Sequence, residues 1–309
     1  MKESKTQQIF CGIDLGGTKI EGIVLIKNHD DFEIIERLRV PTEQQKGYKH
    51  ILDQIGKLVG ELEGKGDVQI SKLGIGTPGT LDPRTQTLKN SNTVCLNGKR
   101  LKEDLEELFG FKVEIANDAN CFALAEATMG SVPEQLPSAN VVFGVIMGTG
   151  VGGGVVVNGR SIHGKHGIGG EWGHNFLDAS GGECYCGRKG CVETIISGTA
   201  LERHYKSLGG NRKTLKEIME AYEKGNDEYA EQTAERLLGF FGKAIASIIN
   251  ILDPEAIVLG GGVGNIDLLY TEGIERVKQH IFNSTLETSF LKPKLGDSAG
   301  VFGAAMLTI

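Results

Sequence analysis

The chain has 309 residues and a formal net charge of −7, from 33 basic and 40 acidic side chains. Its basic residues are scattered, which argues against a nucleic-acid partner, and it contains no apolar run of about 18 residues, so no membrane span is expected. The N-terminus has no apolar signal core, which favours a cytoplasmic protein. Thiols stay reduced there, so clustered cysteines are expected to bind a metal rather than form disulfides.

The N-terminal half alternates strand and helix patterns. Residues 9–26 form two apolar, β-rich runs around a Gly-Gly turn, and residues 32–40 predict a third strand. Residues 47–64 space their apolar side chains at helical intervals. Residues 71–82 predict a buried strand that ends in a Pro-Gly loop, and residues 112–130 predict a strand, a polar turn and an Ala-rich helix.

The C-terminal half repeats this order. Residues 141–159 predict a strand, a glycine turn and a second strand, and residues 256–265 predict a buried strand that ends in three glycines. Helices are expected at about 198–208, 214–224, 228–251, 267–282 and 299–309.

Two of the glycine turns lie in similar segments. When "GIDLGGTKIEGIVL" is placed over "GVIMGTGVGGGVVV", the aligned glycines are Gly12 with Gly144, Gly16 with Gly148, and Gly22 with Gly154. The flanking apolar positions also agree, which suggests a duplicated α/β domain. We therefore expect two α/β lobes with a ligand cleft between them.

The first glycine turn, "DLGGTK", begins at Asp14 and ends at Lys19. Glycines let backbone N–H groups approach phosphate oxygens, Thr18 adds a hydroxyl donor, and Asp14 suits a phosphate-bound Mg²⁺. The spacing is not that of a P-loop, and a plain hairpin turn is the alternative. Two further glycine clusters, 148–154 and 259–265, are candidates for a second phosphate turn and for a backbone against which a planar ring can lie. Each alone is also an ordinary turn, but three in one chain favour a nucleotide.

A polar pair, Asn117 and Asp118, follows the strand expected before the Ala-rich helix. Asp118 is a candidate base that takes a proton from a substrate hydroxyl, as phosphoryl transfer requires. The alternative is that Asp118 is the N-cap of the helix.

A cysteine cluster carries the most specific local pattern. One histidine and three cysteines follow one another with separations of nine, one and four residues, and they are His174, Cys184, Cys186 and Cys191. Such a set suits tetrahedral Zn²⁺, and nearby glycines allow a tight knuckle. Four protein ligands leave no open position, which predicts a structural rather than a hydrolytic zinc.

These segments together resemble the ROK family of sugar kinases and repressors, within the actin/hexokinase/Hsp70 ATPase fold. The resemblance runs from "GIDLGGTK" through "GIGTPG", "NDAN", "GTGVGGG", "GEWGHN" and "CYCGRKGCVE" to "VLGGG" and "GDSAGVFGAA". It implies a two-lobed, duplicated ribonuclease H-like fold with a zinc knuckle, and a last helix that folds back onto the N-terminal lobe. We expect residues 1–121 with 296–309 to form the smaller lobe and residues 122–295 the larger one.

The resemblance also implies roles for individual residues. Asp118 resembles the catalytic base, and the sugar ligands are expected to be Gly79 (by its backbone), Asn117, Asp118, Glu171, His174 and Glu193. His174 then serves both zinc and sugar. The ATP contacts are expected to be Asp14, Gly16, Gly17, Thr18, Lys19, Gly148, Thr149, Gly150, Gly261 and Gly262.

The implied activity is transfer of the γ-phosphoryl group of ATP, with Mg²⁺, to the 6-hydroxyl of a hexose. "NSNTVCLNGK" and "GEWGHN" look most like fructose or mannose kinases, while N-acetylglucosamine kinase and glucokinase are the alternatives. Repressors of the family carry an extra N-terminal DNA-binding domain, for which the residues before the first strand leave no room. The kinase branch is therefore expected over a non-catalytic sugar-sensing regulator, and a homodimer is expected.

Overall fold

The computed structural model describes residues 8–28 and 31–309, and it divides into two compact units. The first unit contains the chain up to Pro137, Gly154–Gly169 and Lys294–Ile309. The second contains Ser138–Gly153 and Gly170–Pro293. The division of the chain into two duplicated lobes that we expect from the sequence is a separate matter from these two compact units, and its boundaries stay a prediction.

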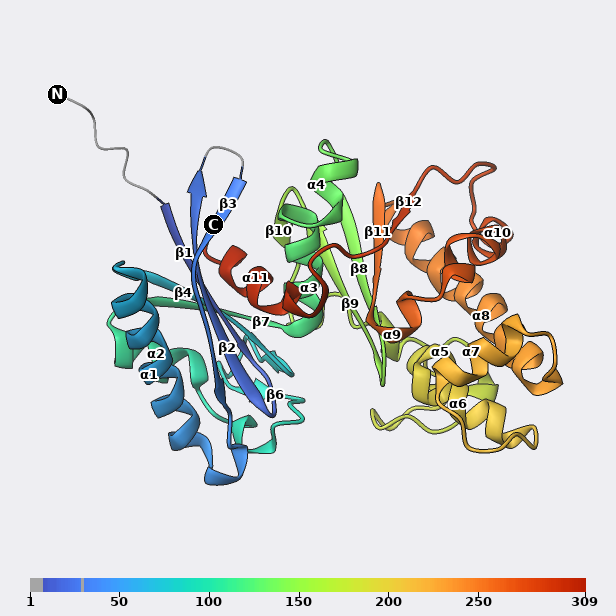
Figure 1. The fold of residues 1–309 in the computed structure, drawn as a ribbon, viewed down its shortest axis with the longest axis horizontal. Helices are drawn as coiled ribbons and strands as arrows, with labels where there is room; N and C mark the ends of the chain where they lie inside the picture. Colours follow the sequence, from blue (N-terminus) through green and yellow to red (C-terminus); the bar gives the residue numbers. More distant parts are fainter. Residues whose placement is uncertain (1–7, 29–30) are drawn as a thin grey trace. The chain divides into compact units, whose positions relative to one another are not determined.

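The first unit is built on a five-stranded sheet in the order β3-β2-β1-β4-β7 (Figure 1). Its strands are β1 (Gln8–Leu15), β2 (Lys19–Asn28), β3 (Asp31–Pro41), β4 (Lys72–Thr77) and β7 (Lys112–Asn117). The first three are antiparallel neighbours, whereas β1, β4 and β7 run parallel. The strands predicted around residues 9–26, 32–40, 71–82 and 112–117 are thereby confirmed.

The two faces of this sheet are covered differently, because side chains alternate along a strand. Cys11, Ile13 and Leu15 of β1 lie in the core that packs against the helices α1 (Tyr48–Gly66) and α2 (Leu101–Phe109). The intervening residues face the other side, where α11 and α3 lie. The predicted helix at 47–64 matches α1, whereas α2 was not predicted from the sequence.

The last helix, α11 (Ala299–Met306), packs on β1 and β4 and against α3 (Asp118–Thr128), as the resemblance implied (Figure 1). Glycines make this contact possible. A Cβ atom on Gly12 would lie 2.3 Å from the Ala305 nitrogen, and one on Gly74 would lie 1.8 Å from the Ala304 carbonyl oxygen. The helix backbone therefore touches the strand backbones directly.

This contact predicts that Gly74→Ala destabilises the protein. The new methyl group overlaps a backbone oxygen that cannot move alone, so α11 must shift, and we expect a loss of about 2–4 kcal/mol in the free energy of unfolding. Gly60→Ala is the matched control, because Gly60 lies in α1 with no atom near its missing Cβ, and it should be neutral or slightly stabilising. Urea denaturation measures both variants, and equal midpoints would contradict the prediction.

A buried carboxylate, that of Glu126, binds the segment that precedes α11. Glu126 of α3 is fully buried and accepts hydrogen bonds from the backbone N–H groups of Ser131, Lys294 and Leu295, at 2.8–3.1 Å. Charge-assisted bonds to backbone N–H groups offset the cost of burying a carboxylate. Glu126 thus fixes the segment that leads to the last helix.

The second sheet has the order β10-β9-β8-β11-β12, which is the same chain-order pattern as the first. Its strands are β8 (Val141–Met147), β9 (Val151–Val157), β10 (Arg160–Ser161), β11 (Ala256–Gly260) and β12 (Ser289–Leu291). In both sheets the last three strands of the order are parallel neighbours. The expected duplication is therefore confirmed in the topology, and the predicted class of two α/β lobes is correct.

Most expected helices of the second half form at the predicted places. The helices are α5 (Glu193–Ile196), α6 (Gly198–Ser207), α7 (Leu215–Glu223), α8 (Glu228–Leu252), α9 (Gly261–Gly264) and α10 (Glu272–Lys278). The helix predicted over 267–282 is wrong in extent: a 3₁₀ turn, Asp267–Tyr270, precedes α10, and the backbone turns away from helical angles at Thr271. Within the described residues, no helix is both long and apolar enough to cross a membrane.

Candidate active site

Three candidate residues of the first unit lie at one edge of its sheet. Strands β1 and β4 pair Asp14 with Gly76, and β4 and β7 end side by side. The carboxyl ends of parallel strands therefore meet at this edge, which is where open α/β sheets bind ligands. Asp14, Gly79 and Asp118 lie at or just beyond these three strand ends.

The first glycine turn is held by a buried threonine. The Gly16 N–H donates to the Lys19 carbonyl oxygen at 3.0 Å and closes the turn between β1 and β2. Thr42 donates from its hydroxyl to the Gly16 carbonyl oxygen at 2.6 Å and from its backbone N–H to the Thr18 carbonyl oxygen at 3.0 Å. Thr18 and Lys19 remain exposed, so a phosphate group can reach both side chains.

A buried carboxylate, Glu21, lies next to this turn. It bonds to Arg37, to Arg39 at 2.9 Å and, more loosely, to Lys19 at 3.6 Å. Burial raises the pKa of Glu21, but the hydrogen bonds from Arg39 and Arg37 outweigh this effect and hold the pKa below its ordinary value. Glu21 therefore stays negative, and Arg37 also donates to the Ser298 hydroxyl at 2.7 Å, just before α11.

Asp14 lies among negative charges. Burial, then the charge of Asp118 and then that of Glu21, raise the pKa of Asp14 to about 6, while Lys19 acts in the opposite direction. A bound divalent cation favours the ionised form of a carboxyl group whose ionisation neighbouring carboxylates disfavour. The geometry thus agrees with the Mg²⁺ role that the sequence predicts for Asp14.

The helix cap at α3 corrects one alternative from the sequence. The N-cap residue is Asn117, whose side-chain oxygen accepts from the Asn120 N–H at 2.8 Å. Asp118 is the first helical residue and accepts from the Ala119 N–H at 2.8 Å. It is solvent-accessible, yet the protein around it limits hydration and raises its pKa despite this bond. Capping does not require Asp118, which leaves its carboxylate available for proton transfer.

Gly79 has a conformation that only glycine adopts readily. Its φ is +88°, and a Cβ atom there would lie 2.5 Å from the Lys89 carbonyl oxygen and 2.8 Å from the Ser91 nitrogen. The turn after β4 is therefore packed tightly against the segment around β6 (Leu88–Lys89), which agrees with a backbone role for Gly79 rather than a side-chain role.

In the second unit, the second glycine turn joins β8 to β9. The Gly148 N–H donates to the Gly150 carbonyl oxygen at 2.9 Å. The start of α6 is fastened to this turn, because the Gly198 N–H donates to the Gly148 carbonyl oxygen at 2.7 Å and the Thr199 hydroxyl donates to the Thr149 carbonyl oxygen at 2.7 Å. The turn is thus rigidly placed at a helix N-terminus, where anions bind favourably.

The third glycine cluster lies beside the second turn. Strands β8 and β11 are parallel, and Gly261 follows β11 with a φ of +78°. A Cβ atom on Gly261 would lie 2.3 Å from the Met147 carbonyl oxygen, whereas nothing lies near the missing Cβ of Gly262. The bare backbone at Gly262 leaves room for a flat ligand group, as the sequence predicts for the adenosine segment.

The segment 171–174 is anchored by the single tryptophan of the chain. Trp172 is buried, packs edge-on against Phe143 at 5.9 Å between ring centroids, and donates from its indole N–H to the Gly152 carbonyl oxygen at 3.2 Å. Its two neighbours in the predicted sugar set, Glu171 and His174, stay partly exposed. Trp172 therefore fixes the backbone from which both side chains project.

Glu193 connects the cysteine cluster with the second glycine turn. One of its carboxylate oxygens accepts from the Val151 N–H at 3.0 Å, and the same oxygen lies only 2.5 Å from where a Cβ atom on Gly150 would be. Its chain position, two residues after Cys191, also ties it to the predicted zinc knuckle. A predicted sugar ligand and a predicted phosphate turn are thus in direct contact.

The four predicted metal ligands come together. The ligand atoms of His174, Cys184, Cys186 and Cys191 all lie within 4.8 Å of one another. A tetrahedral zinc with Zn–S of about 2.3 Å and Zn–N of about 2.0 Å requires S···S of about 3.8 Å and S···N of about 3.5 Å. The Cys186–Cys191 sulfur distance is 3.7 Å, and His174 Nδ1 lies 3.5 Å from the Cys184 sulfur. The residues fit a zinc ion, with Nδ1 as the histidine ligand.

The other ring nitrogen of His174 has a partner that the sequence did not indicate. His174 Nε2 lies 2.9 Å from the Tyr185 hydroxyl, and the two rings meet edge to face at 5.0 Å. Tyr185 is 80% exposed, but its hydroxyl end lies among protein groups: burial first, and then the charges of Glu193 and Glu171, raise the pKa of Tyr185 to about 12. The phenol thus lies among three predicted sugar ligands.

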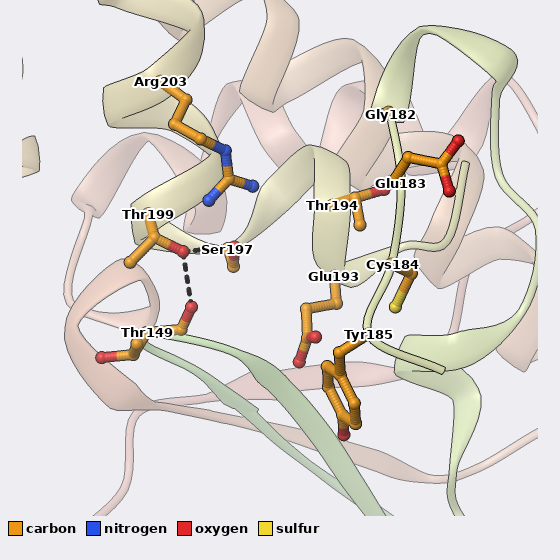
Figure 2. Close-up of a pocket in the computed structure, with 11 residues that line it drawn as sticks. Thr149, Gly182, Glu183, Cys184, Tyr185, Glu193, Thr194, Ser197, Thr199 and Arg203 are labelled. Atoms are coloured by element: carbon orange, nitrogen blue, oxygen red, sulfur yellow. Dashed lines mark hydrogen bonds between the residues drawn. The ribbon is translucent and has the colours of Figure 1, made fainter. Parts of the chain in front are cut away.

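A cavity of about 330 Å³ opens between the cysteine cluster and α6 (Figure 2). Its lining residues are Thr149, Gly181, Gly182, Glu183, Cys184, Tyr185, Glu193, Thr194, Ser197, Thr199 and Arg203. Figure 2 shows Tyr185 and Glu193 next to each other, whereas Arg203 lies on the side of Thr199 and Thr149. No motif in the sequence marks Ser197, Thr199 or Arg203, and Tyr185 is marked only by its place between Cys184 and Cys186.

The predicted site residues therefore form two groups, each within one unit. The first unit brings together the first glycine turn with Gly79, Asn117 and Asp118. The second brings together the second and third glycine clusters, Glu171, Glu193 and the cysteine cluster.

Comparisons with known proteins agree on one family. The model of the ROK family matches residues 10–309. The chain is 35% identical to the N-acetyl-D-glucosamine kinase of Aliivibrio fischeri over 97% of its own length and 99% of that protein, and 36% identical to the enzyme of that name from Vibrio atlanticus over 97% and 100%. The ROK hexokinase of Thermus thermophilus superposes with a TM-score of 0.86 at 30% identity, covering 97% of both chains. The ROK family glucokinase of Streptomyces griseus, solved with glucose and AMPPNP, gives 0.73 at 28% identity, covering 97% of this chain and 99% of that one.

The protein is a sugar kinase with the actin-like ATPase architecture, as its fold, its glycine turns and its Cys₃His cluster together indicate. The protein transfers phosphate from ATP to a sugar. The chain belongs to the ROK family.

Proposed function

We propose that the protein is an ATP-dependent N-acetyl-D-glucosamine kinase that phosphorylates the 6-hydroxyl group. The observation that carries this proposal is the agreement among its relatives: eight curated proteins, 34–36% identical over 97% of the chain, all bear the name N-acetyl-D-glucosamine kinase. The expectation of fructose or mannose has no such support. N-acetylglucosamine kinase, an alternative named from the sequence, is therefore better supported than a fructose or mannose kinase.

In this proposal Asp118 accepts the proton of the sugar 6-hydroxyl as its oxygen attacks the γ-phosphorus. Burial raises the pKa of Asp118, which makes its carboxylate a stronger base than that of an ordinary aspartate. Asn117, the backbone at Gly79, Glu171 and Glu193 bind the other sugar groups. The expected sugar contact of His174 becomes indirect, because its Nδ1 faces the zinc position and its Nε2 faces the Tyr185 hydroxyl. Carboxylates accept hydrogen bonds from sugar hydroxyl groups, and they orient the sugar without taking part in bond breaking.

The two glycine turns are proposed to hold the phosphates of ATP, and Gly261 and Gly262 its adenosine. Mg²⁺ bound to the phosphates neutralises the charge that develops during transfer, and Asp14 is the carboxylate proposed to hold it. Zn²⁺, when bound by the Cys₃His cluster, supplies a rigid link rather than a Lewis acid. We further propose a cytoplasmic homodimer.

The proposal is tested by the release of ADP with a panel of sugars: N-acetylglucosamine, N-acetylmannosamine, glucose, mannose and fructose. We expect the highest kcat/KM with N-acetylglucosamine. A preference of tenfold or more for another sugar would show that the sugar is misassigned while the kinase activity stands. No sugar-dependent ADP release at all would overturn the proposal.

The binding of MgATP should depend on pH through Asp14. Its pKa of about 6 lies above its ordinary value of 3.8, so the carboxylate becomes neutral as the pH falls through about 6 and loses its attraction for Mg²⁺. We expect the KM for MgATP to rise about tenfold from pH 7 to pH 5, the change that one protonation produces. Initial rates at saturating sugar measure this. In Asp14→Asn the KM should be high at every pH, and a flat profile in the unmutated protein would rule out this role.

A further inference from the structure

The cavity beside the cysteine cluster contains few side-chain donors whose hydrogens are free. The Thr194 hydroxyl donates to the Cys191 carbonyl oxygen at 2.7 Å. The Thr199 hydroxyl donates to the Thr149 carbonyl oxygen, also at 2.7 Å. Both hydroxyl hydrogens are therefore already used by backbone carbonyl groups.

Two other donors lie at the α6 end of the cavity. Ser197 is the N-cap of α6, and its hydroxyl oxygen accepts from the Ala200 N–H at 3.2 Å and lies 3.3 Å from the Thr199 hydroxyl. Arg203 projects from the same helix on that side (Figure 2). Both thus lie on the α6 side of the cavity, whereas Tyr185 lies next to Glu193 (Figure 2).

Tyr185 is the donor on the side of the cysteine cluster, next to Glu193 (Figure 2). Since His174 Nδ1 faces the cysteine sulfurs at the distance that zinc requires, a neutral imidazole carries its hydrogen on Nε2. That N–H donates to the Tyr185 oxygen, which lies 2.9 Å away. The tyrosine oxygen is then the acceptor of this bond, so the phenolic hydrogen is left for another partner.

The groups around this hydrogen define what the partner should be. Glu171 and Glu193 are acceptors that suit sugar hydroxyl groups, but they repel a carbonyl oxygen, which can only accept hydrogen bonds. We propose that Tyr185 donates its phenolic hydrogen to the acetamido carbonyl oxygen of the sugar, and so makes the site specific for an N-acetylhexosamine over a plain hexose. This inference rests on the proposed function and names the residue that decides the choice of sugar.

The position of Tyr185 supports such a role. It lies between two zinc ligands, Cys184 and Cys186, so the knuckle fixes its backbone, while its exposed ring is held by His174. A site built to hydrogen-bond one substrate group discriminates strongly against a substrate that lacks it, because the protein group is then left unpaired. A rigidly placed phenol meets this requirement.

The test measures sugar affinity without ATP, by calorimetry or by the fluorescence of Trp172. In Tyr185→Phe we expect the Kd for N-acetylglucosamine to rise about tenfold or more, while the Kd for glucose changes less than twofold. Zinc content should stay at that of the unmutated protein. Tyr229→Phe, which removes a hydroxyl from α8, is the matched control and should leave both affinities unchanged.

Equal weakening for both sugars would mean that Tyr185 only positions His174, and would overturn the specificity role, as would unchanged affinities. A second measurement uses the unmutated protein with the thioacetyl analogue of N-acetylglucosamine, whose sulfur is a poor acceptor. It should bind about tenfold more weakly than the oxygen compound, and equal binding would also overturn the inference. If the unmutated protein does not bind N-acetylglucosamine, the proposed function fails and this inference fails with it.

Discussion

Asp118→Asn should lower kcat by about 10³-fold while the sugar Kd stays within about threefold of its original value. The amide keeps the size of the side chain and can still accept from the Ala119 N–H, which now holds Asp118 at 2.8 Å. It cannot take up a proton, and a positioned general base contributes about 10²–10⁴-fold to such reactions. Steady-state ADP release measures kcat, and the fluorescence of Trp172 measures sugar binding.

Asp67→Asn is the control for this substitution. Asp67 is exposed at the end of α1 with a positive φ, a conformation that asparagine tolerates well. This variant should retain full activity and stability. If Asp118→Asn kept more than a tenth of the original kcat, Asp118 would not be the base.

Cys184→Ser should release the zinc and weaken sugar binding by about 10–100-fold. The sulfur lies 3.5 Å from His174 Nδ1, so its loss breaks the set of ligands that fixes the histidine. Removing a residue that orients the ligands of a metal typically costs about 10–100-fold in metal affinity or activity, and we expect a similar loss of sugar affinity here. The same change should lower the thermal midpoint, because a bound metal stabilises only the folded chain.

Zinc content by elemental analysis and sugar affinity by calorimetry should change together in this variant. Cys95→Ser is the matched control, since Cys95 lies in the 3₁₀ turn Val94–Leu96 and is not one of the four clustered residues. Zinc loss with normal sugar affinity would separate the metal from sugar recognition, and the scaffolding role would be wrong.

Some features of the site were predictable because they depend on short stretches of chain. The cysteine spacing needs no tertiary information, and all four ligands meet as predicted. The glycine turns were predictable for the same reason, because each lies between two strands that are neighbours in sequence. Asn117 and Asp118 were found at the correct strand end, but which of them caps the helix depends on where the helix begins, and the sequence does not determine that to one residue.

Other features come from contacts between distant segments. The cavity combines the turn at Thr149, the knuckle at Tyr185 and the helix at Arg203, which no linear pattern connects. Helix α2 was missed because only Leu101 and Leu105 of its nine residues are buried, and two positions do not establish a period. The preference for a sugar is decided by single donor and acceptor groups, so similarity over a loop is a weak guide to it, and the relatives favour the alternative, N-acetylglucosamine.

The contact between α11 and the first sheet also sets an order of events during synthesis. The ribosome completes β1, β4 and α3 long before it reaches Gly303, whose missing Cβ would lie 1.8 Å from the Cys121 carbonyl oxygen. Until α11 emerges from the ribosome, the glycine faces of these strands have no covering helix. The first unit therefore cannot finish folding before α11 has left the ribosome, and a chain truncated before α11 should be a product that chaperones and proteases recognise as unfinished.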